Sequence, residues 1–201
     1  MAEQIDFTAC VVSGGVELLE RINSAREEYS PLCGGYFDYL SGKYGKPTFR
    51  QSACGFILLD GLLQKNGIDR RSLDLARNSD GRPCVINRRD VDLSISHSEG
   101  AALACLAVGE NAGVGADIQR VRNYSREHLE RLARSFMDET ELSGFLESGD
   151  RERYFYTLWT RREAFYKRCG SYYGFGGSFS TGIITACGRL YYYSISQPGE
   201  D

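Results

Sequence analysis

One long amphipathic segment, Arg151–Cys169, constrains the fold more than any other feature of this sequence. Apolar side chains recur there at the spacing of one helix face, and Gly170 follows as a stop signal. We therefore predict a helix over this range that buries a single stripe. The stripe is expected to contain Phe155, Leu158, Trp159, Phe165, Tyr166 and Cys169.

Further helices are predicted by apolar spacing and by capping residues. Ser52–Lys65 has apolar residues at helical spacing and Gly67 as its stop, and Val16–Ile22 has the composition of a helix start. The rest of residues 1–48, and residues 68–90, show no regular period.

Two capping patterns lie between these segments and the long helix. Ser125 suits the N-cap of a helix whose apolar face holds Leu129, Leu132, Ala133 and Phe136. Asp138 and Glu141 have the spacing of a capping box for a second short helix.

Short apolar runs predict strands. Val91–Ser96 and Ala101–Val108 are interpreted as two strands joined around His97–Gly100. Val114–Ile118 predicts another short strand, and Leu190–Ser196 a last one. Leu93–His97 and Tyr193–Gln197 also share a Ser-Ile-Ser core, which either reflects two related halves or arose by chance.

Composition limits the classes of protein to consider. A chain of 201 residues with 42% apolar residues forms one ordinary domain or two small ones. No apolar run approaches the roughly 20 residues of a membrane-spanning helix. Glu3 and Asp6 stand where a signal peptide would be basic, so we expect a cytoplasmic protein without a membrane partner. A net charge of −3 argues against nucleic acid as a partner.

The seven cysteines have no CxxC spacing, so a structural zinc site has no support and we expect reduced thiols, most of them in the core. Several common catalytic motifs are also missing from the sequence. It has no phosphate-binding GxxxxGK[ST] loop, no GxSxG elbow and only two histidines. A Ser-His-Asp hydrolase and a histidine-rich metal site are therefore excluded as leading hypotheses.

Three groups of polar residues remain as candidates. The first is Ser94–Ser98, where hydroxyls and the His97 imidazole could hold phosphate oxygens or simply form a hydrogen-bonded turn. In the second, Asp117 and Gln119 point to the same side of a strand, which suits a hard cation such as magnesium but also a solvated strand end. In the third, Glu163 and Lys167 are neighbours on one helix face, as in a surface ion pair.

The order of the motifs carries more information than each motif alone. Gly81-Arg-Pro83 is followed by Ser-Ile-Ser-His97-Ser, Val-Gly-Ala-Asp117-Ile, Thr-Glu141-Leu and Leu-Trp-Thr-Arg-Arg-Glu163-Ala-Phe-Tyr-Lys167. Over about residues 50 to 180 the chain resembles the Sfp-type 4'-phosphopantetheinyl transferases. The resemblance implies an α+β fold of two similar halves related by a pseudo-twofold axis, with the site in the cleft between them. We place the boundary near Gly109–Gly113, which gives residues 1–109 and 110–201.

The resemblance also implies an activity and its participants. Members of this family transfer the phosphopantetheine arm of coenzyme A to a serine of an acyl or peptidyl carrier protein and release adenosine 3',5'-bisphosphate. The implied cofactor is Mg²⁺, with coenzyme A as co-substrate and an apo carrier protein as partner. We expect a monomer, as for other two-half members.

The resemblance implies roles for individual residues that match the family motifs. Asp117 and Glu163 match metal ligands, and Glu163 also matches the proposed general base. Lys167 matches the lysine beside the pyrophosphate, so Glu163, Lys167 and Asp117 form the expected catalytic set. Ser96 and His97 match residues that hold the 3'-phosphate.

Arg82 stands where the family commonly has lysine and is expected near the phosphates of coenzyme A. Lys46, Arg50 and Ser52 are further candidate nucleotide contacts.

Three positions depart from the family pattern. Gln119 replaces a common carboxylate, so it brings an amide oxygen but no charge to the metal site. Arg162 replaces the usual lysine before the glutamate, and Ala116 fills a position usually held by Ile or Val. Two alternatives therefore stay open beside the active transferase: a binding module for coenzyme A or a carrier without catalysis, and a metal-dependent phosphohydrolase.

A basic stretch follows the strand that holds Asp117. Arg120, Arg122, Arg126, Arg131 and Arg134 lie within it and are expected either to dock an acidic carrier or to form a solvated helix face balanced by Glu127 and Glu130.

Overall fold

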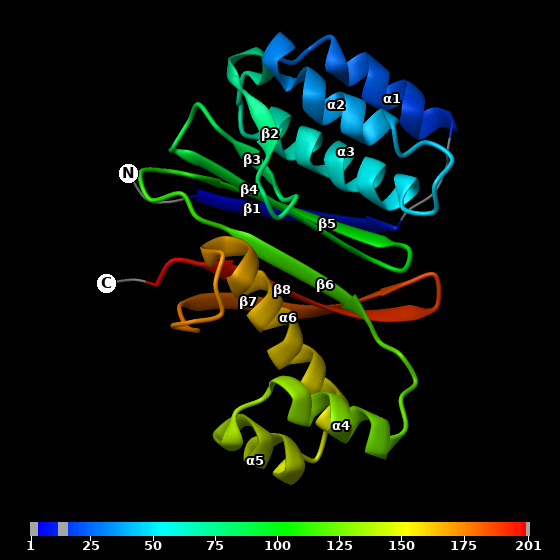
Figure 1. Cartoon of the computed structure of the whole chain (residues 1–201), viewed down its shortest axis with the longest axis vertical. Helices are drawn as coiled ribbons and strands as arrows, with labels where there is room; N and C mark the ends of the chain where they lie inside the picture. The colour runs from blue at the N-terminus through cyan, green and yellow to red at the C-terminus, as the bar shows by residue number, and fades with distance from the viewer. Residues whose placement is uncertain (1–3, 12–15, 200–201) are drawn as a thin grey trace.

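A computed structural model describes residues 4–11 and 16–199, and it is an α+β structure with helices and strands in both halves of the chain (Figure 1). Glu3, which entered the signal-peptide argument, lies outside the described residues. The first part of the chain contains β1 (Gln4–Val11), α1 (Val16–Arg26), α2 (Gly34–Ser41), α3 (Phe49–Lys65), β2 (Leu75–Arg77), β3 (Pro83–Val85), β4 (Val91–Ser98) and β5 (Ala101–Val108). The second contains β6 (Gly115–Arg120), α4 (Arg126–Phe136), α5 (Glu139–Glu147), α6 (Arg151–Cys169), β7 (Ser178–Ala186) and β8 (Arg189–Gln197).

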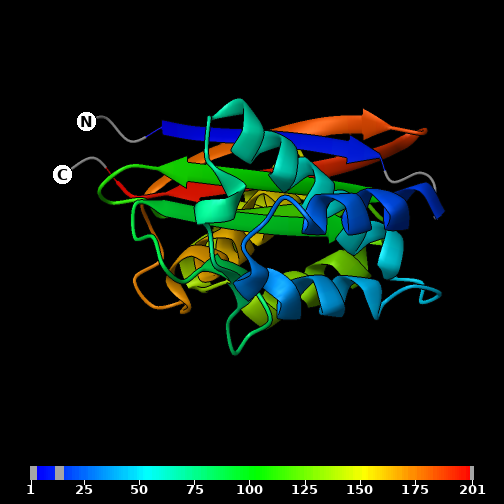
Figure 2. The same cartoon turned by 90° about the horizontal axis from the view of Figure 1, so that it is seen from above.

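Two antiparallel three-stranded sheets form the centre of the molecule. Their strand orders are β1-β5-β4 and β6-β8-β7, so in each sheet a first strand and a later hairpin are arranged in the same way. In Figures 1 and 2 the strands of both sheets lie roughly along a common axis, with neighbouring strands pointing in opposite directions. The predicted boundary falls in the loop between β5 and β6. The two sheets therefore share a strand order, while the two similar halves, their pseudo-twofold axis and the division at residue 109 stay predictions.

The strand β5 explains how the two halves pack. Ala102, Ala104 and Leu106 face a core formed with α1, α2 and α3. The alternate residues Leu103 and Cys105 face a second core formed with β6 and β8. The strand is thus buried on both faces, which is why its sequence is an uninterrupted apolar run.

A close approach places α6 against β6. A Cβ atom added at Gly115 would collide with the carbonyl oxygen of Ala164, so only glycine permits this packing. At the other end of α6 a third core joins Phe155 of this helix to Leu129 of α4 and Phe145 of α5. Gly115 thereby brings the part of α6 that contains Glu163 and Lys167 next to the strand that contains Asp117.

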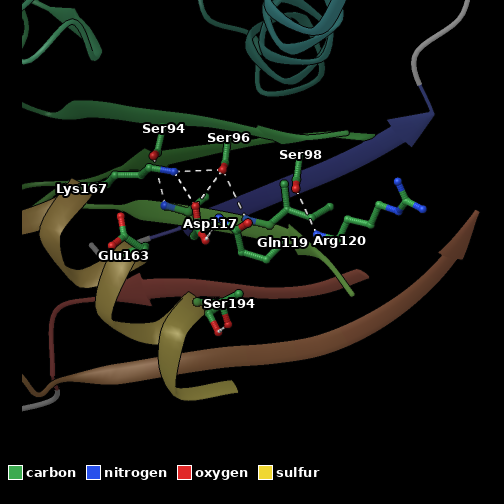
Figure 3. Close-up of polar contacts among 12 residues, drawn as sticks. Ser94, Ser96, Ser98, Asp117, Gln119, Arg120, Glu163, Lys167 and Ser194 are labelled. Atoms are coloured by element: carbon green, nitrogen blue, oxygen red, sulfur yellow. Dashed lines mark hydrogen bonds and ion pairs between the residues drawn. The ribbon is translucent and has the colours of Figure 1, made fainter. Parts of the chain in front are cut away.

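The two sheets are joined by a ladder of side chains rather than by strand pairing (Figure 3). The hydroxyl oxygens of Ser94, Ser96 and Ser98 on β4 accept hydrogen bonds from the backbone N–H groups of Ala116, Ile118 and Arg120, at 3.0, 3.3 and 3.0 Å. One rung earlier, Asp92 Oδ2 accepts from the Val114 N–H group at 2.9 Å. These four pairs, which we call the side-chain ladder, occupy the edge of β6 that does not pair with β8. They satisfy buried backbone donors that would otherwise lack partners.

Local sequence signals located several elements correctly. The helix Arg151–Cys169, its left-handed Gly170 stop, the strand Ala101–Val108 and the capping box of Asp138 and Glu141 are confirmed. The strand β4 runs on to Ser98, so the prediction of a turn from His97 is wrong and His97 is a strand residue. The predicted buried stripe of α6 is only partly correct, because Phe155 and Phe165 are buried whereas Leu158, Trp159 and Tyr166 are half-buried and Cys169 is exposed. The face that packs on β6 and β8 carries Ala164 and Thr160 instead.

The repeated Ser-Ile-Ser core does not mark equivalent strands. Its first copy lies in β4, the first strand of one hairpin, and its second in β8, the second strand of the other. The proposed relation between these two segments is therefore wrong, even though the sheets share a strand order. The two copies serve different contacts: Ser94 and Ser96 accept from the backbone of β6, whereas Ser194 and Ser196 are buried against α6, where they bond to Thr160 and Arg168.

Cys33, Cys54 and Cys105 are buried, Cys10 and Cys84 are half-buried, and Cys169 and Cys187 are exposed, so the expected place in the core holds for only some of the cysteines. Among the described residues, no helix has both the length and the apolar character needed to cross a membrane.

Removing one rung of the side-chain ladder is expected to destabilise the fold. Ser94→Ala leaves the N–H group of the fully buried Ala116 without its acceptor, which costs about 1–3 kcal/mol of unfolding free energy. Urea unfolding measures this loss, with Ser98→Ala, at a partly exposed rung, as the milder control. A Ser94→Ala protein as stable as the parent would show that the ladder does not hold the sheets together.

Candidate active site

A cleft of about 640 Å³ lies between the two halves, bordered by β4, β6, α6 and the loops near α2 and β3. Its lining brings together residues that are widely separated in the sequence. These include seven residues that the family motifs predicted for the site: Arg82, Ser96, His97, Asp117, Gln119, Glu163 and Lys167. The cleft is therefore the candidate active site.

Asp117 lies at the centre of the polar network, with only 2% of its surface exposed (Figure 3). Its Oδ1 accepts from the Ser96 hydroxyl at 2.9 Å and from Lys167 Nζ at 2.7 Å. Its Oδ2 accepts from the Gln119 amide at 3.1 Å. A buried carboxylate needs such partners, because an unpaired buried charge is strongly unfavourable.

Lys167 connects α6 to both halves of the molecule. Its ammonium donates to Ser96 Oγ at 2.9 Å as well as to Asp117. An ammonium has three donor hydrogens, so one remains for a ligand in the cleft. Lys167 is partly exposed, which leaves this donor accessible.

Glu163 lies one helical turn before Lys167 and lines the same cleft. Its Oε1 accepts a hydrogen bond from the Tyr172 hydroxyl at 2.9 Å. Burial, followed by this hydrogen bond to the carboxylate, raises the pKa of Tyr172 to about 12. Tyr172 was missed by sequence reasoning, because no local pattern indicates that a loop tyrosine contacts a carboxylate on the preceding helix.

The oxygen donors in the cleft suit a hard cation. Each carboxylate oxygen accepts about two hydrogen bonds, so Asp117 Oδ2, with one partner, has an open position. Glu163 adds a second carboxylate and Gln119 an amide oxygen if its amide group rotates by half a turn. Among the described residues no three His, Cys, Asp or Glu side chains group closely enough to hold a metal. The set fits Mg²⁺, which one or two carboxylates often hold together with water and substrate phosphates.

His97 lines the cleft together with residues of α2, among them Tyr39. Desolvation, then the positive charges of Lys167 and Lys43, lower the pKa of the His97 imidazole. The Arg77 guanidinium lies 3.6 Å from the centre of the Tyr39 ring, which also lines the cleft. Arg77 and Tyr39 were missed because they lie in segments without a regular period.

The remaining candidate nucleotide contacts separate into two groups. Ser52 lines the cleft and accepts from Lys43 Nζ at 2.8 Å. Lys46 and Arg50 instead border a different hollow beside Tyr44, so their contact with the nucleotide stays a prediction.

The Arg82 guanidinium donates its hydrogen bonds to acceptors within the protein. Its Nη2 donates to both oxygens of Asp92, at 2.9 and 2.8 Å, and to the carbonyls of Leu93 and Val114, each at 2.8 Å. Its Nη1 donates to the Lys167 carbonyl. Arg82 thus ties β4, the start of β6 and the end of α6 together. Its expected contact with coenzyme A phosphates stays a prediction, and the structure gives its guanidinium a bracing role.

Ser96 also has a role that the sequence did not predict. Its hydroxyl donates to Asp117 and accepts from Lys167 and from the backbone of Ile118. With its hydrogen-bonding capacity used in this way, Ser96 orients Asp117. Its expected contact with a 3'-phosphate stays a prediction.

The basic stretch after β6 is largely paired within the protein. Arg120 and Arg122 both bind the carboxylate of Glu99, and Arg134 binds Glu130 at 2.7 Å. Arg131 contacts His128 at 3.1 Å. The docking role of these arginines stays a prediction. Glu99 neutralises part of the positive charge that would attract an acidic carrier.

Comparison with known proteins identifies relatives. Residues 113–187 match the family model of the 4'-phosphopantetheinyl transferase superfamily. Over 130 residues the chain is 28% identical to the 4'-phosphopantetheinyl transferase Sfp of Bacillus subtilis (strain 168). The aligned region covers 63% of this chain and 55% of that protein. The chain thus spans about half the length of this curated relative. The resemblance based on the motifs is confirmed, and the matched range includes Asp117, Glu163 and Lys167.

Two arginines of the cleft are expected to respond differently to substitution. Arg82→Met removes a charged network among β4, β6 and α6, so the unfolding free energy should fall by about 2 kcal/mol. Arg77→Met, at an exposed position, should leave stability nearly unchanged but weaken binding of adenosine 3',5'-bisphosphate. Thermal unfolding and calorimetric titration measure the two effects. A stable Arg82→Met protein that loses only nucleotide affinity would contradict the bracing role.

Proposed function

Because the chain matches the 4'-phosphopantetheinyl transferase superfamily, we propose that it transfers the 4'-phosphopantetheine group of coenzyme A to a serine of an acyl or peptidyl carrier protein. Adenosine 3',5'-bisphosphate is the second product. The observation that carries this proposal is that Asp117, Glu163 and Lys167, from β6 and α6, line one cleft between the halves. Such a cleft can hold a dinucleotide-like donor with its pyrophosphate beside all three side chains.

Glu163 is proposed as the general base. It accepts the proton of the carrier serine while the serine oxygen forms a bond to the β-phosphorus of coenzyme A. The bond between this phosphorus and the bridging oxygen breaks, and adenosine 3',5'-bisphosphate leaves with that oxygen. Because Glu163 borders the cleft at the edge of α6, a hydroxyl arriving from solvent can reach it.

Lys167 and Asp117 support the departure of the nucleotide. The third donor of Lys167 is proposed to bind a pyrophosphate oxygen and to offset the negative charge that develops there. Asp117, Glu163 and the amide oxygen of Gln119 would hold Mg²⁺. When bound, this ion supplies further charge neutralisation at the pyrophosphate.

His97 is proposed to contact the 3'-phosphate of the nucleotide. Lys167 and Lys43 help to lower the pKa of its imidazole, and a phosphate would oppose their effect by favouring the protonated ring. Arg77, which also lines the cleft, is proposed as a second cation for this phosphate.

The carrier is proposed to be acidic and to dock against the basic side of α4. Arg126 and Arg131 are the better candidates for this contact, because Arg120 and Arg122 share the Glu99 carboxylate.

Transfer to a carrier protein is the direct test of this function. With Mg²⁺, coenzyme A and a panel of apo carriers, the protein should add a phosphopantetheine mass to at least one carrier, as seen by mass spectrometry. Glu163→Ala should lower the rate about 10²–10⁴-fold, the range for loss of a general base. Glu139→Ala, at an exposed position on α5, serves as the matched control and should retain the parent rate.

The same assay separates the alternatives. Binding of coenzyme A without any product would indicate a binding module. The observation that favours this alternative is the ion pair between Lys167 and Asp117, which occupies part of each side chain's bonding capacity. Cleavage of the nucleotide without a carrier would indicate a phosphohydrolase. Either result would contradict the transferase.

A further inference from the structure

Tyr172 makes a contact that none of the family motifs includes. It follows the left-handed Gly170 at the end of α6, and its hydroxyl donates to Glu163 Oε1 at 2.9 Å. Its ring stacks on Tyr166, with 4.6 Å between ring centres and 20° between planes. Although 46% of its surface is exposed, Tyr172 is thus fixed both by its ring and by its hydroxyl.

The loop that contains Tyr172 is anchored to α6 and β7. Phe175 packs edge-on against Phe165 at 5.6 Å, and the Arg162 guanidinium lies 5.1 Å from the Phe175 ring centre. Arg168 donates to the carbonyl of Gly176 at 3.4 Å. These contacts hold residues 171–177 in place, so the position of the Tyr172 hydroxyl is set by the fold.

Glu163 lies at the boundary between two cavities. One is the cleft already described, and the other has a volume of about 330 Å³ and is lined by Phe136, Trp159, Arg162, Glu163 and Tyr172. A glutamate side chain at such a boundary can turn toward either space, and ordering it costs conformational entropy. A partner that fixes one carboxylate oxygen removes this freedom.

We propose that Tyr172 is a positioning residue that holds Oε1 of Glu163 and thereby directs Oε2 toward the cleft. This inference rests on the proposed function, in which Oε2 receives the proton of the carrier serine. A phenol keeps its proton at neutral pH and donates one hydrogen bond in a defined direction. Loss of a side chain that hydrogen-bonds to a reacting or metal-binding group, without touching the substrate itself, typically lowers activity or metal affinity 10–100-fold.

Tyr172→Phe tests the hydroxyl while keeping the aromatic ring that stacks on Tyr166. The turnover number should fall about tenfold, while the KM values for coenzyme A and carrier should change less than twofold. The melting temperature should be unchanged. Tyr173→Phe is the matched control, because Tyr173 lies in the same loop with 93% of its surface exposed, and it should behave as the parent.

A double-mutant cycle distinguishes positioning from a general structural effect. In a Glu163→Gln background, measured in single turnovers at excess enzyme, Tyr172→Phe should cause little further loss, because the carboxylate that it orients has been removed. An equal loss in both backgrounds, or no loss in the parent background, would overturn the proposal.

A structural measurement separates this inference from the proposed function. In crystals of Tyr172→Phe, the Glu163 carboxylate should occupy more than one orientation, whereas in the parent and in Tyr173→Phe it should occupy one. A single unchanged orientation in Tyr172→Phe would refute the positioning role even if the parent transfers phosphopantetheine. If the parent transfers nothing to any carrier, the proposed function fails, and this comparison still decides the role of Tyr172.

Discussion

The side-chain ladder between β4 and β6 is the interaction on which the rest of the structure depends. Asp92, Ser94, Ser96 and Ser98 accept from alternate N–H groups along an edge of β6 that lacks a partner strand. Small hydroxyl side chains let the two sheets approach closely while satisfying buried backbone donors. Ser96 also donates to Asp117, so the rung that joins the two halves orients the central acid of the cleft as well. The Ser96 hydroxyl thus contributes both to the contact between the sheets and to the position of Asp117 in the candidate active site.

The buried charge of Asp117 points to function rather than to stability. Burying a carboxylate and pairing it with Lys167 gains little net stability, because desolvation offsets the attraction. The pair persists in a cleft where both groups have hydrogen-bonding capacity left for a ligand. Gly115 contributes indirectly, since it lets α6 lie against β6 and so brings Lys167 within reach of Asp117. Arg82 holds the same junction from the other side through Asp92, Val114 and the Lys167 carbonyl.

Features fixed by neighbouring residues were predictable from the sequence, whereas those fixed by distant contacts were not. The capping box of Asp138 and Glu141 and the Gly170 stop depend on local backbone geometry, and both are confirmed. The strand β1 was missed because its apolar residues gave no clear period, and β7 because Ser, Thr and Gly suggested a loop. The motif order placed the cleft residues correctly. It did not reveal that Arg82 and Ser96 are held by intramolecular bonds, because their partners on β6 and α6 are far away in the sequence.

The central claim is that Asp117, oriented by the ladder, and Glu163, on α6, act together on one bound donor and its cation. Anomalous diffraction from crystals grown with Mn²⁺ and coenzyme A tests this claim most directly. We expect a Mn²⁺ peak within ligand distance of both carboxylates, with the pyrophosphate of coenzyme A beside Lys167. A Mn²⁺ peak elsewhere, or a donor bound away from both acids, would contradict it.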